Sequence, residues 1–269
     1  MKSLKIKIAR TCGGIAADDG ALNKILESYF RSYLSDEEPL FNIYIKGSYR
    51  NLNKPCGNGW PVFVRETKEV YEIIEKREKK TRLLGIIDSR KNLCHIDIRK
   101  YFNYSNLIQA LRACFHLFIE ERGGFFLHAG CGVVSGKAYI FAGRHGAGKS
   151  TALRNLQPES VIAEDTVVIK NNGCDSLVFS TPFRREENAS GRVEALIFPR
   201  KFRGSPYKIK EPKAASASEL ISNALFSSPY SWRLVDSVVK NISLLCESTP
   251  GYRLYFPREG SIREVVTGT

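Results

Sequence analysis

The chain has 269 residues, 43% of them hydrophobic, which is enough to bury the core of one large domain or two small ones. Its formal net charge of +13 favours anionic ligands such as a nucleotide, an acidic peptide or a nucleic acid. No segment approaches the ~18 continuous apolar residues of a membrane span, and the N-terminus lacks the apolar centre of a secretion signal, so we expect a cytoplasmic protein. Seven cysteines without C-x-x-C spacing predict reduced, packed thiols and not disulfides or a zinc site.

Short apolar runs separated by turn-rich breaks predict a β-rich N-terminal region at residues 1–104. A helix is expected at 21–33, and a break rich in asparagine, proline and glycine at 51–59. The charged run at 75–82 predicts a solvated hairpin or helix face and not a nucleic-acid site, because glutamates interrupt its basic residues. The expected strands are 4–8, 40–45, 62–64, 70–74, 83–87 and 95–98.

A helix at 106–121, with Ser105 as its N-cap and two glycines after it, is expected to bridge the two regions, so that residues 105–124 form the connection. Residues 125–134 then predict a strand that turns at 135–137 into a second strand at 138–141. Because no helix separates these two strands, they must pair antiparallel, and the sheet must be mixed.

Further elements are expected in the remaining sequence. A strand at 161–169 precedes an Asn-Gly turn and a strand at 177–180. The chain after Pro199 reads as a basic loop to residue 213. Helices at 217–226 and 231–247 and a strand pair at 252–256 and 262–266 complete the expected elements.

The loop between the strand at 138–141 and a helix start matches the pattern G-x-x-x-x-G-K-[ST] in full. Glycines allow consecutive backbone N–H groups to face a triphosphate, Lys149 would reach its outer phosphates, and the Ser150 hydroxyl would ligate Mg²⁺. A glycine-rich turn without a ligand is the alternative, which the order strand, loop, helix disfavours. The residues expected to bind the nucleotide are Gly143, Arg144, His145, Gly146, Ala147, Gly148, Lys149, Ser150 and Thr151.

Two carboxylates, Glu164 and Asp165, follow the loop by one helix and lie within the strand expected at 161–169. Since neighbouring residues on a strand point to opposite faces, one acid would ligate or orient Mg²⁺ and the other would accept a proton. The alternative is an edge pair of solvated acids. His128, in the first strand of the hairpin, is on spacing alone a packed core histidine, and His145 is expected at the exposed tip of the loop.

Basic residues in two segments could neutralise charge on a transferring phosphoryl group. The candidates are Arg184, Arg185, Arg200, Lys201 and Arg203. The sequence does not choose among them, and most are expected to be ordinary residues of a solvated loop.

Three pieces in this order, Phe126-Leu-His-Ala129, Gly143–Ser150 and Ala163-Glu-Asp-Thr-Val167, resemble the HPr serine kinase family and its smaller relatives, including kinases that tailor lasso peptides. The segment at 249–256 resembles their C-terminal end. The resemblance implies a P-loop core similar to phosphoenolpyruvate carboxykinase, in the α/β class, and phosphoryl transfer to a serine hydroxyl.

The same resemblance implies roles for single residues. His128 becomes a phosphate-site residue, Glu164 falls on the first family aspartate, the proposed base, and Asp165 falls on the second. Because glutamate is longer than aspartate, either the acceptor sits farther away or Asp165 is the critical acid. No Glu-x-Arg-Gly-type strand follows the core, so neither HPr itself as acceptor nor the reverse phosphorolysis is implied.

We therefore expect residues 125–269 to form the nucleotide-binding and catalytic domain of a kinase that uses ATP and Mg²⁺. Its acceptor would be an anionic peptide, protein or small molecule that carries a hydroxyl group. A nucleic acid is disfavoured as a partner, because glutamates interrupt the basic run. A homo-oligomer is compatible with the sequence. The leading alternative is an ATPase or nucleotide-sensing module without a phosphate acceptor, and a nucleic-acid binder is the weaker third.

Overall fold

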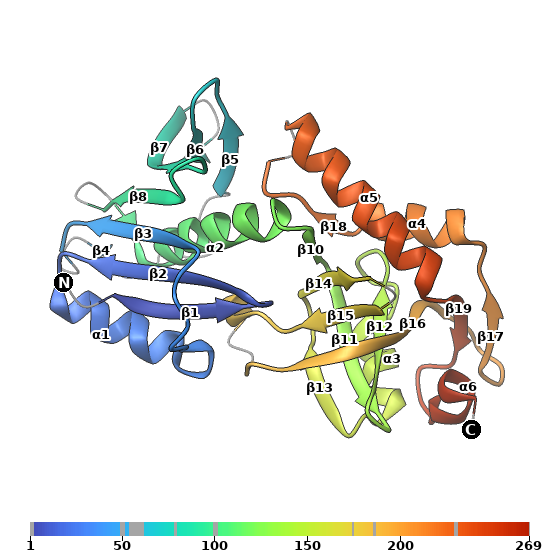
Figure 1. Ribbon diagram of the computed structural model, residues 1–269. Helices are drawn as coiled ribbons and strands as arrows, with labels where there is room; N and C mark the ends of the chain where they lie inside the picture. Colours follow the sequence, from blue (N-terminus) through green and yellow to red (C-terminus); the bar gives the residue numbers. More distant parts are fainter. Residues whose placement is uncertain are drawn as a thin grey trace. The chain divides into compact units, whose positions relative to one another are not determined.

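The computed structural model describes residues 3–48, 52–53, 62–77, 80–98, 102–173, 175–184, 187–228 and 231–268, and forms two compact units (Figure 1). The first unit contains residues 1–122 and 226–235, and the second contains 123–225 and 236–269. Most of the turn-rich break expected at 51–59 lies outside the described residues. The elements of the first unit are β1 (Leu4–Ile8), β2 (Thr11–Ala17), α1 (Gly20–Tyr29), η1 (Arg31–Tyr33), β3 (Phe41–Lys46), β4 (Leu52–Asn53), β5 (Val62–Glu66), β6 (Tyr71–Arg77), β7 (Lys80–Asp88), β8 (Leu93–Asp97), β9 (Phe102–Asn103) and α2 (Tyr104–Glu120).

The first unit contains a seven-stranded mixed sheet in the order β1-β2-β3-β8-β7-β6-β5. The helix α1 connects the parallel strands β2 and β3, and it begins where Asp19 accepts hydrogen bonds from the amides of Ala21 (2.7 Å) and Leu22 (3.4 Å). Its buried Leu22 and Leu26 are four residues apart, as one face of a helix requires. The described residues of the charged run, 75–77 and 80–82, lie in β6 and β7. They form a hairpin as one expectation had it, but Glu75 is buried and not solvated.

The helix α2 packs on this sheet through aromatic rings. The ring of Phe41 in β3 stacks on Phe118 at 4.1 Å between centroids and meets Phe115 edge-on at 5.0 Å. Gly13 in β2 leaves room for these rings, because a Cβ there would lie 2.5 Å from Phe41 and 2.9 Å from Phe115. The sequence did not predict β2, since its Gly-rich run lacks a strand pattern.

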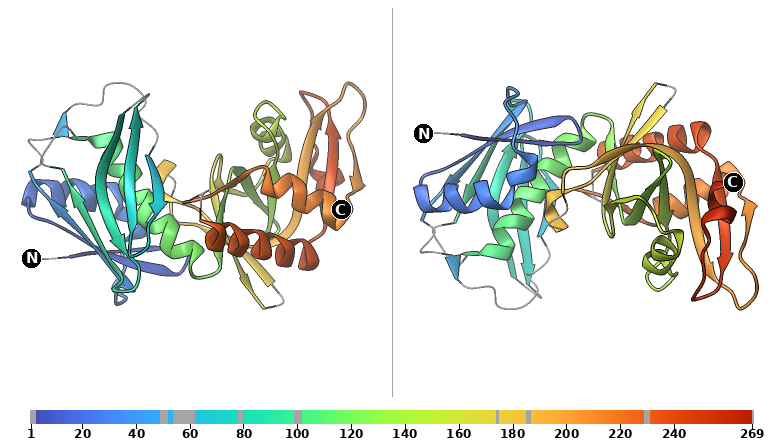
Figure 2. Two further views of the ribbon diagram at one scale, coloured as in Figure 1. Left: turned by 90° about the horizontal axis from the view of Figure 1, so that it is seen from above. Right: turned by 90° about the horizontal axis from the view of Figure 1, so that it is seen from below.

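The second unit contains a ten-stranded mixed sheet with the path β13-β11-β12-β16-β15-β14-β10-β18, from which β19 and β17 extend beside β16 (Figure 2). The helix α5 begins within residues 226–235 of the first unit and continues in the second. The elements from residue 123 onward are β10 (Gly124–Leu127), β11 (Ala129–Val134), β12 (Lys137–Ala142), α3 (Lys149–Leu156), β13 (Ser160–Ala163), β14 (Val167–Asn172), β15 (Asp175–Phe179), η3 (Pro182–Arg184), β16 (Ser190–Lys201), β17 (Tyr207–Lys210), α4 (Lys213–Ile221), β18 (Ala224–Leu225), α5 (Trp232–Ser248), β19 (Gly251–Phe256) and α6 (Arg263–Thr267).

The predicted antiparallel hairpin is present as β11 and β12, with Val134 opposite Lys137. Its two turn residues, Ser135 (φ 51°) and Gly136 (φ 74°), both have positive φ, as the tight turns that match strand twist require. The next pairing of β12 is with β16 and is parallel. The structure is therefore that of a mixed α/β chain, and its sheets are mixed, as the hairpin predicted.

Two predicted strands are in fact broken, and both breaks fall at candidate site residues. The strand expected at 125–134 is interrupted at His128, because β10 pairs with β14 and β18 whereas β11 pairs with β12 and β13. The strand expected at 161–169 is likewise two strands, β13 and β14, joined by a bend that holds Glu164 and Asp165. An apolar run indicates burial, but it does not show that the chain changes its pairing partner within the run.

Other expectations for the C-terminal part were wrong. The long strand β16 was not predicted, and the expected basic loop contains β17, an edge strand that pairs with β19. The strand expected at 262–266 is instead the helix α6, which follows its N-cap residue Ile262. Ile262 (1% exposed) and Val266 (2% exposed) are buried in one hydrophobic cluster. Their spacing of four residues fits one helix face, which the sequence reading missed.

The five described cysteines are all buried and free, as expected for packed thiols; Cys56 and Cys174 lie outside the described residues. Burial raises the pKa of the Cys246 thiol to about 11. None of the helices in the described ranges is both long and apolar enough to cross a bilayer.

Candidate functional site

The phosphate-binding loop predicted from the sequence joins β12 to α3. Its glycines have positive φ: 151° at Gly143, 78° at Gly146 and 101° at Gly148. Side chains rarely adopt such values, and a Cβ at Gly148 would also lie 3.1 Å from the ring of Phe256 in β19. The glycines therefore fix the backbone path that the loop takes around the N-terminus of α3, where amides and the helix dipole favour an anion.

Lys149 is folded back into its own loop. Its Nζ donates to the carbonyl oxygens of Gly143 at 2.6 Å and of Arg144 at 3.4 Å, and the residue is only 9% exposed. Burial lowers the pKa of Lys149, while the nearby carboxylates of Asp165 and Glu219 raise it. The ammonium is thus a partly desolvated cation held among backbone carbonyls, within a loop whose Arg144, His145 and Ser150 are exposed.

The exposed side of the loop consists of Arg144, His145 and Gly146, together with Ser150 at the start of α3. Thr151 and Ala147 are half-buried. The position of His145 at the exposed tip agrees with the sequence expectation. The Ser150 hydroxyl is therefore accessible to a ligand at the helix N-terminus.

Strand register explains why distant residues meet at this loop. The pair Ala129–Ala142 in β11 and β12 puts His128 beside the first residue of the loop. The pair Cys131–Ala163 in β11 and β13 brings the following bend, with its two acids, to the same end of the sheet. Gly130 permits this approach, because a Cβ there would lie 3.3 Å from the carbonyl oxygen of Glu164.

Asp165 and His128 are in direct contact. The Nδ1 atom of His128 lies 3.2 Å from Oδ1 of Asp165 and 3.0 Å from its backbone oxygen. The hydroxyl of Thr166 donates to Oδ2 of Asp165 at 3.1 Å, and the amide of His128 donates to the carbonyl of Asn223 at 2.9 Å. Both side chains remain about one-third exposed, 31% and 34%, so the pair is fixed yet accessible.

Glu164 has an exposed side chain. The expectation that strand alternation separates the two acids was wrong in its premise, because both lie in the bend and not in a strand. What distinguishes them is their surroundings: Asp165 contacts His128 and raises the pKa of Lys149, whereas Glu164 faces solvent.

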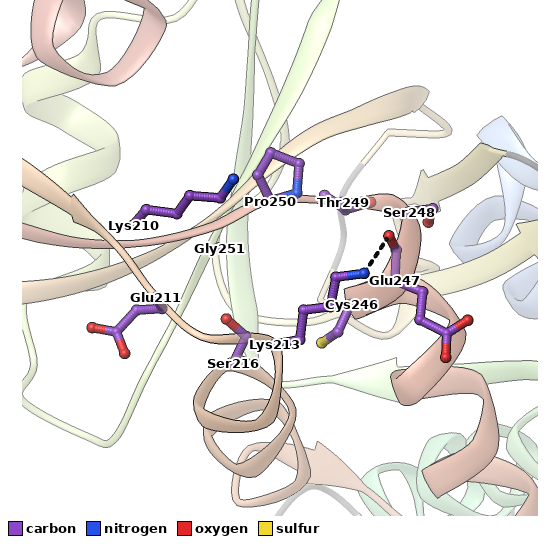
Figure 3. A pocket seen from close by; sticks show the side chains of 10 residues that line it. All are labelled: Lys210, Glu211, Lys213, Ser216, Cys246, Glu247, Ser248, Thr249, Pro250 and Gly251. Carbon is purple, nitrogen blue, oxygen red and sulfur yellow. Dashed lines mark hydrogen bonds between the residues drawn. The ribbon is translucent and has the colours of Figure 1, made fainter.

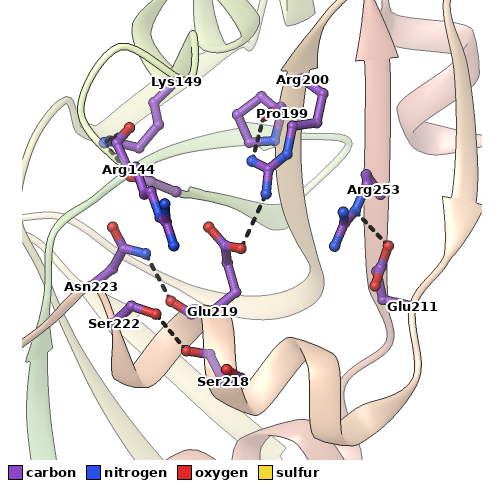
Figure 4. A network of polar contacts seen from close by, with 11 residues as sticks. Arg144, Lys149, Pro199, Arg200, Glu211, Ser218, Glu219, Ser222, Asn223 and Arg253 are labelled. Carbon is purple, nitrogen blue, oxygen red and sulfur yellow. Dashed lines mark hydrogen bonds and ion pairs between the residues drawn. The ribbon is translucent and has the colours of Figure 1, made fainter.

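Two further residues border the loop. Arg200 at the end of β16 and Glu219 in α4 form an ion pair with 3.1 Å between Nη2 and Oε2 (Figure 4). A Cβ built on Gly143 would lie 3.7 Å from Oε1 of Glu219 and 3.9 Å from Nη1 of Arg200. Arg200 was one of several basic candidates, but Glu219 was missed, because no sequence signal links a residue of an amphipathic helix to a loop so far before it.

The other basic candidates differ in position. The Cε atom of Lys201 lies 3.9 Å from a Cβ built on Gly148, so this side chain also borders the loop. Arg203 is exposed in the turn before β17. Arg184 ends the short helix η3, and Arg185 lies outside the described residues.

Oxygen donors suited to Mg²⁺ are present near the loop, in the Ser150 hydroxyl and the Asp165 carboxylate. Among the described residues, no cluster of three or more histidine, cysteine or acidic side chains could hold a metal ion by itself. This set fits an ion that arrives with a nucleotide, since Mg²⁺ commonly takes one or two protein ligands and completes its shell with phosphate oxygens and water.

A separate cavity of about 230 Å³ lies where α4 begins, with Glu211, Lys213 and Ser216 in its lining (Figure 3). Lys213 donates across it to the backbone oxygen of Glu247 at 3.3 Å. None of the loop residues lines this cavity. We place the candidate site at the loop, because loops of this kind bind a triphosphate through backbone amides and a lysine and do not need a deep cavity.

No family model matches the sequence, and no curated protein matches it. Among solved structures, the HPr(Ser) kinase/phosphatase from Coxiella burnetii is similar over 49% of this chain and 85% of that chain, with 10% identity and a TM-score of 0.28. The sheets of the chain itself make it a mixed α/β protein. Its structural resemblance to that kinase/phosphatase is distant. A resemblance at this level leaves the chemistry to be argued from the residues themselves.

Proposed function

We propose that the chain is an ATP- and Mg²⁺-dependent kinase that transfers the γ-phosphate of ATP to a hydroxyl of a peptide, protein or small molecule. The observation that carries this proposal is the convergence of the phosphate loop, Lys149 and the Asp165–His128 pair at one end of the sheet. A loop alone supports nucleotide binding, whereas the adjacent accessible acid supports transfer. In the same proposal, the core is of the phosphoenolpyruvate carboxykinase type.

The donor half of the site would bind the nucleotide through the loop. Its amides face the phosphates, and Lys149 leaves the carbonyl oxygens of Gly143 and Arg144 to contact the outer phosphates. Ser150 would hold the Mg²⁺ that accompanies ATP and that neutralises charge on the β- and γ-phosphates. The net positive charge of the chain supports the capture of such an anion.

The acceptor half of the site would use Asp165. The acceptor oxygen bonds to the γ-phosphorus while the bond from that phosphorus to the bridging oxygen breaks, ADP leaves, and the acceptor proton passes to the carboxylate. His128 orients Asp165 through their contact at 3.2 Å. Glu164, which is exposed, would assist from the solvent side. In the alternative role, the carboxylate of Asp165 would ligate Mg²⁺. The two roles predict a different dependence of the transfer rate on Mg²⁺ concentration in the Asp165→Asn variant.

The experiment is to incubate the protein with γ-labelled ATP, Mg²⁺ and panels of hydroxyl-bearing peptides and small molecules, and to follow the label. Kinase activity moves label to an acceptor, and the Lys149→Ala variant is expected to move about 1000-fold less. Release of free phosphate at the full rate of ATP consumption, whatever acceptor is added, would show an ATPase instead. Absence of ATP binding would contradict both functions.

A further inference from the structure

Two arginine–glutamate pairs lie on the same face of the second unit's sheet. Arg200 in β16 pairs with Glu219 at 3.1 Å, and Arg253 in the neighbouring strand β19 pairs with Glu211 at 2.7 Å. The register aligns Phe198 with Arg253, and Arg200 lies two residues beyond Phe198, so the two arginines share a face. Both arginine side chains are 32% exposed, and the glutamates are 16% and 13% exposed.

Only one of these pairs borders the phosphate loop. Glu219 and Arg200 both lie within 4 Å of the position that a Cβ on Gly143 would take, at 3.7 Å and 3.9 Å. Glu219 also raises the pKa of Lys149, whereas no such effect comes from Glu211. Figure 4 shows the Arg200–Glu219 pair between Lys149 and the second pair, Arg253 and Glu211. The similar exposure of the two pairs makes the second a natural reference for the first.

The guanidinium of Arg200 has donors beyond the one that it gives to Glu219. Its Nη2 atom donates to Oε2 of Glu219 at 3.1 Å. The Nη1 atom of Arg200 donates to the carbonyl of the adjacent Pro199 at 3.1 Å, a local bond that a stronger acceptor can replace. A phosphate oxygen is such an acceptor, because charge-assisted bonds from the planar guanidinium to phosphate are about twice as strong as neutral ones.

The position of Glu219 is tied to the catalytic pair. Its backbone oxygen accepts a hydrogen bond from Nδ2 of Asn223 at 2.7 Å, and the oxygen of Asn223 accepts one from the amide of His128 at 2.9 Å. The segment from Glu219 to Asn223 therefore fixes both the end of α4 and the strand break at His128. Glu219 can thus hold Arg200 at a defined distance from the loop and from Asp165.

We propose that Arg200 contacts the γ-phosphoryl group of the bound nucleotide and neutralises its charge during transfer, and that Glu219 is the positioning residue that holds the guanidinium at the loop. The inference rests on the proposed function and chooses one arginine among the basic candidates. Its physical basis is that charge in phosphoryl transfer is spread over the oxygens of the moving group, where a fixed arginine stabilises it.

The first measurement is nucleotide affinity, which does not require an acceptor. We expect Arg200→Met to weaken binding of ATP about tenfold more than binding of ADP, because only ATP carries the γ-phosphate. Arg253→Met, the matched control, should leave the ratio of the two dissociation constants unchanged. Equal effects of the two substitutions on this ratio, or no change in either variant, would overturn the inference.

The second measurement is transfer to an acceptor. Arg200→Met is expected to lower kcat about 100-fold, and Arg200→Lys to recover only part of the loss, since lysine lacks the planar fork. Glu219→Gln should lower kcat about tenfold at unchanged KM for ATP, as expected for a residue that acts through Arg200. Glu211→Gln should stay within about threefold of the unmodified chain.

The outcomes separate this inference from the proposed function. Full transfer by Arg200→Met, with loss of transfer in Lys149→Ala, would contradict the role of Arg200 and leave the kinase in place. Conversely, absence of transfer to any acceptor, with the ATP-selective loss still present in Arg200→Met, would place Arg200 at the γ-phosphate of a protein that is not a kinase. Melting temperatures of all six variants identify any that fail to fold.

Discussion

The two units use charged side chains in opposite ways. In the first unit, Glu120 is fully buried, lies 3.1 Å from Nε2 of His116 and accepts a hydrogen bond from the amide of Ser227 at 3.1 Å. In the second unit, Asp165 and Glu219 retain exposed surface and surround a glycine loop. Buried acids with internal partners support the fold, whereas accessible acids gathered at strand ends around an anion-binding loop are available for chemistry.

This comparison predicts which substitutions affect function and which affect stability. Removing one partner of a buried charge leaves the other uncompensated and lowers stability strongly. Removing a half-exposed acid near the loop costs little stability, because solvent replaces its partners. A substitution in either unit that changed both function and stability would contradict the comparison.

The largest effect is expected at Lys149. Its replacement by alanine should lower ATP affinity and transfer about 1000-fold, because the loop loses the cation that reaches the outer phosphates. The free energy of unfolding should not fall, since burial disfavours the ammonium. Titration with a fluorescent ATP analogue and thermal unfolding measure the two quantities. Lys240→Ala, which removes an exposed lysine of α5, is the control and should leave ATP affinity unchanged.

The next effect is expected at Glu120 and concerns stability alone. Glu120→Ala should lower the free energy of unfolding by about 3 kcal/mol, because His116 and Ser227 lose a buried partner. ATP affinity measured below the unfolding transition should not change. Glu37→Ala, which removes a surface acid of the same unit, should cost under about 1 kcal/mol in urea unfolding. Similar losses in the two variants would contradict the assignment of Glu120 to the fold.

A smaller effect is expected from the two acids of the bend. Asp165→Asn should lower transfer at least about tenfold, or ~1.4 kcal/mol in the activation free energy, whereas Glu164→Gln should have a smaller effect. Initial rates at several Mg²⁺ concentrations measure this difference. If excess Mg²⁺ restores the transfer rate of Asp165→Asn, the carboxylate of Asp165 ligates the metal. If the rate stays low, the proton-accepting role is supported. A larger loss in the Glu164 variant would reverse the assignment.

The smallest effect concerns pH. Because burial lowers the pKa of Lys149 below the ordinary 10.5, its ammonium deprotonates in the folded chain before it would in the unfolded chain. The unfolded chain then binds more protons in this window, so the contribution of Lys149 to stability rises with pH. Affinity for ATP should fall over the same window, because the neutral amine no longer attracts phosphate. Urea unfolding and ATP titration from pH 8 upward measure how stability and ATP affinity change with pH. The contribution of Lys149 is the difference between the unmodified chain and Lys149→Met. The same pH dependence in both proteins would contradict the assignment of these effects to Lys149.

Local patterns in the sequence predicted a substantial part of the fold. The expected strands at 4–8, 62–64 and 83–87 fall within β1, β5 and β7, and the hairpin of β11 and β12 follows from a turn too short for a crossover. The helix α2 begins at Tyr104, close to the predicted start. These features depend on periodicity and turn chemistry over a few residues, which a sequence carries directly.

Features that depend on pairing partners were not predicted. The bend at Glu164 and Asp165 exists because β13 and β14 join different neighbours, and α6 buries Ile262 and Val266 as a helix although the same residues fit a short strand. The strand β17 is stabilised by β19, which lies far along the chain. Such choices depend on contacts between distant segments.

For the candidate site, the sequence by itself determined the glycine loop with Lys149 and Ser150. The loop conformation and the charge that are typical of phosphate-binding loops are encoded in consecutive residues. Only the tertiary structure decided that Asp165 contacts His128 and that Arg200 and Glu219 border Gly143. These residues come from separate strands and a helix, and only the register of the sheet and the packing of α4 bring them to one end of the fold.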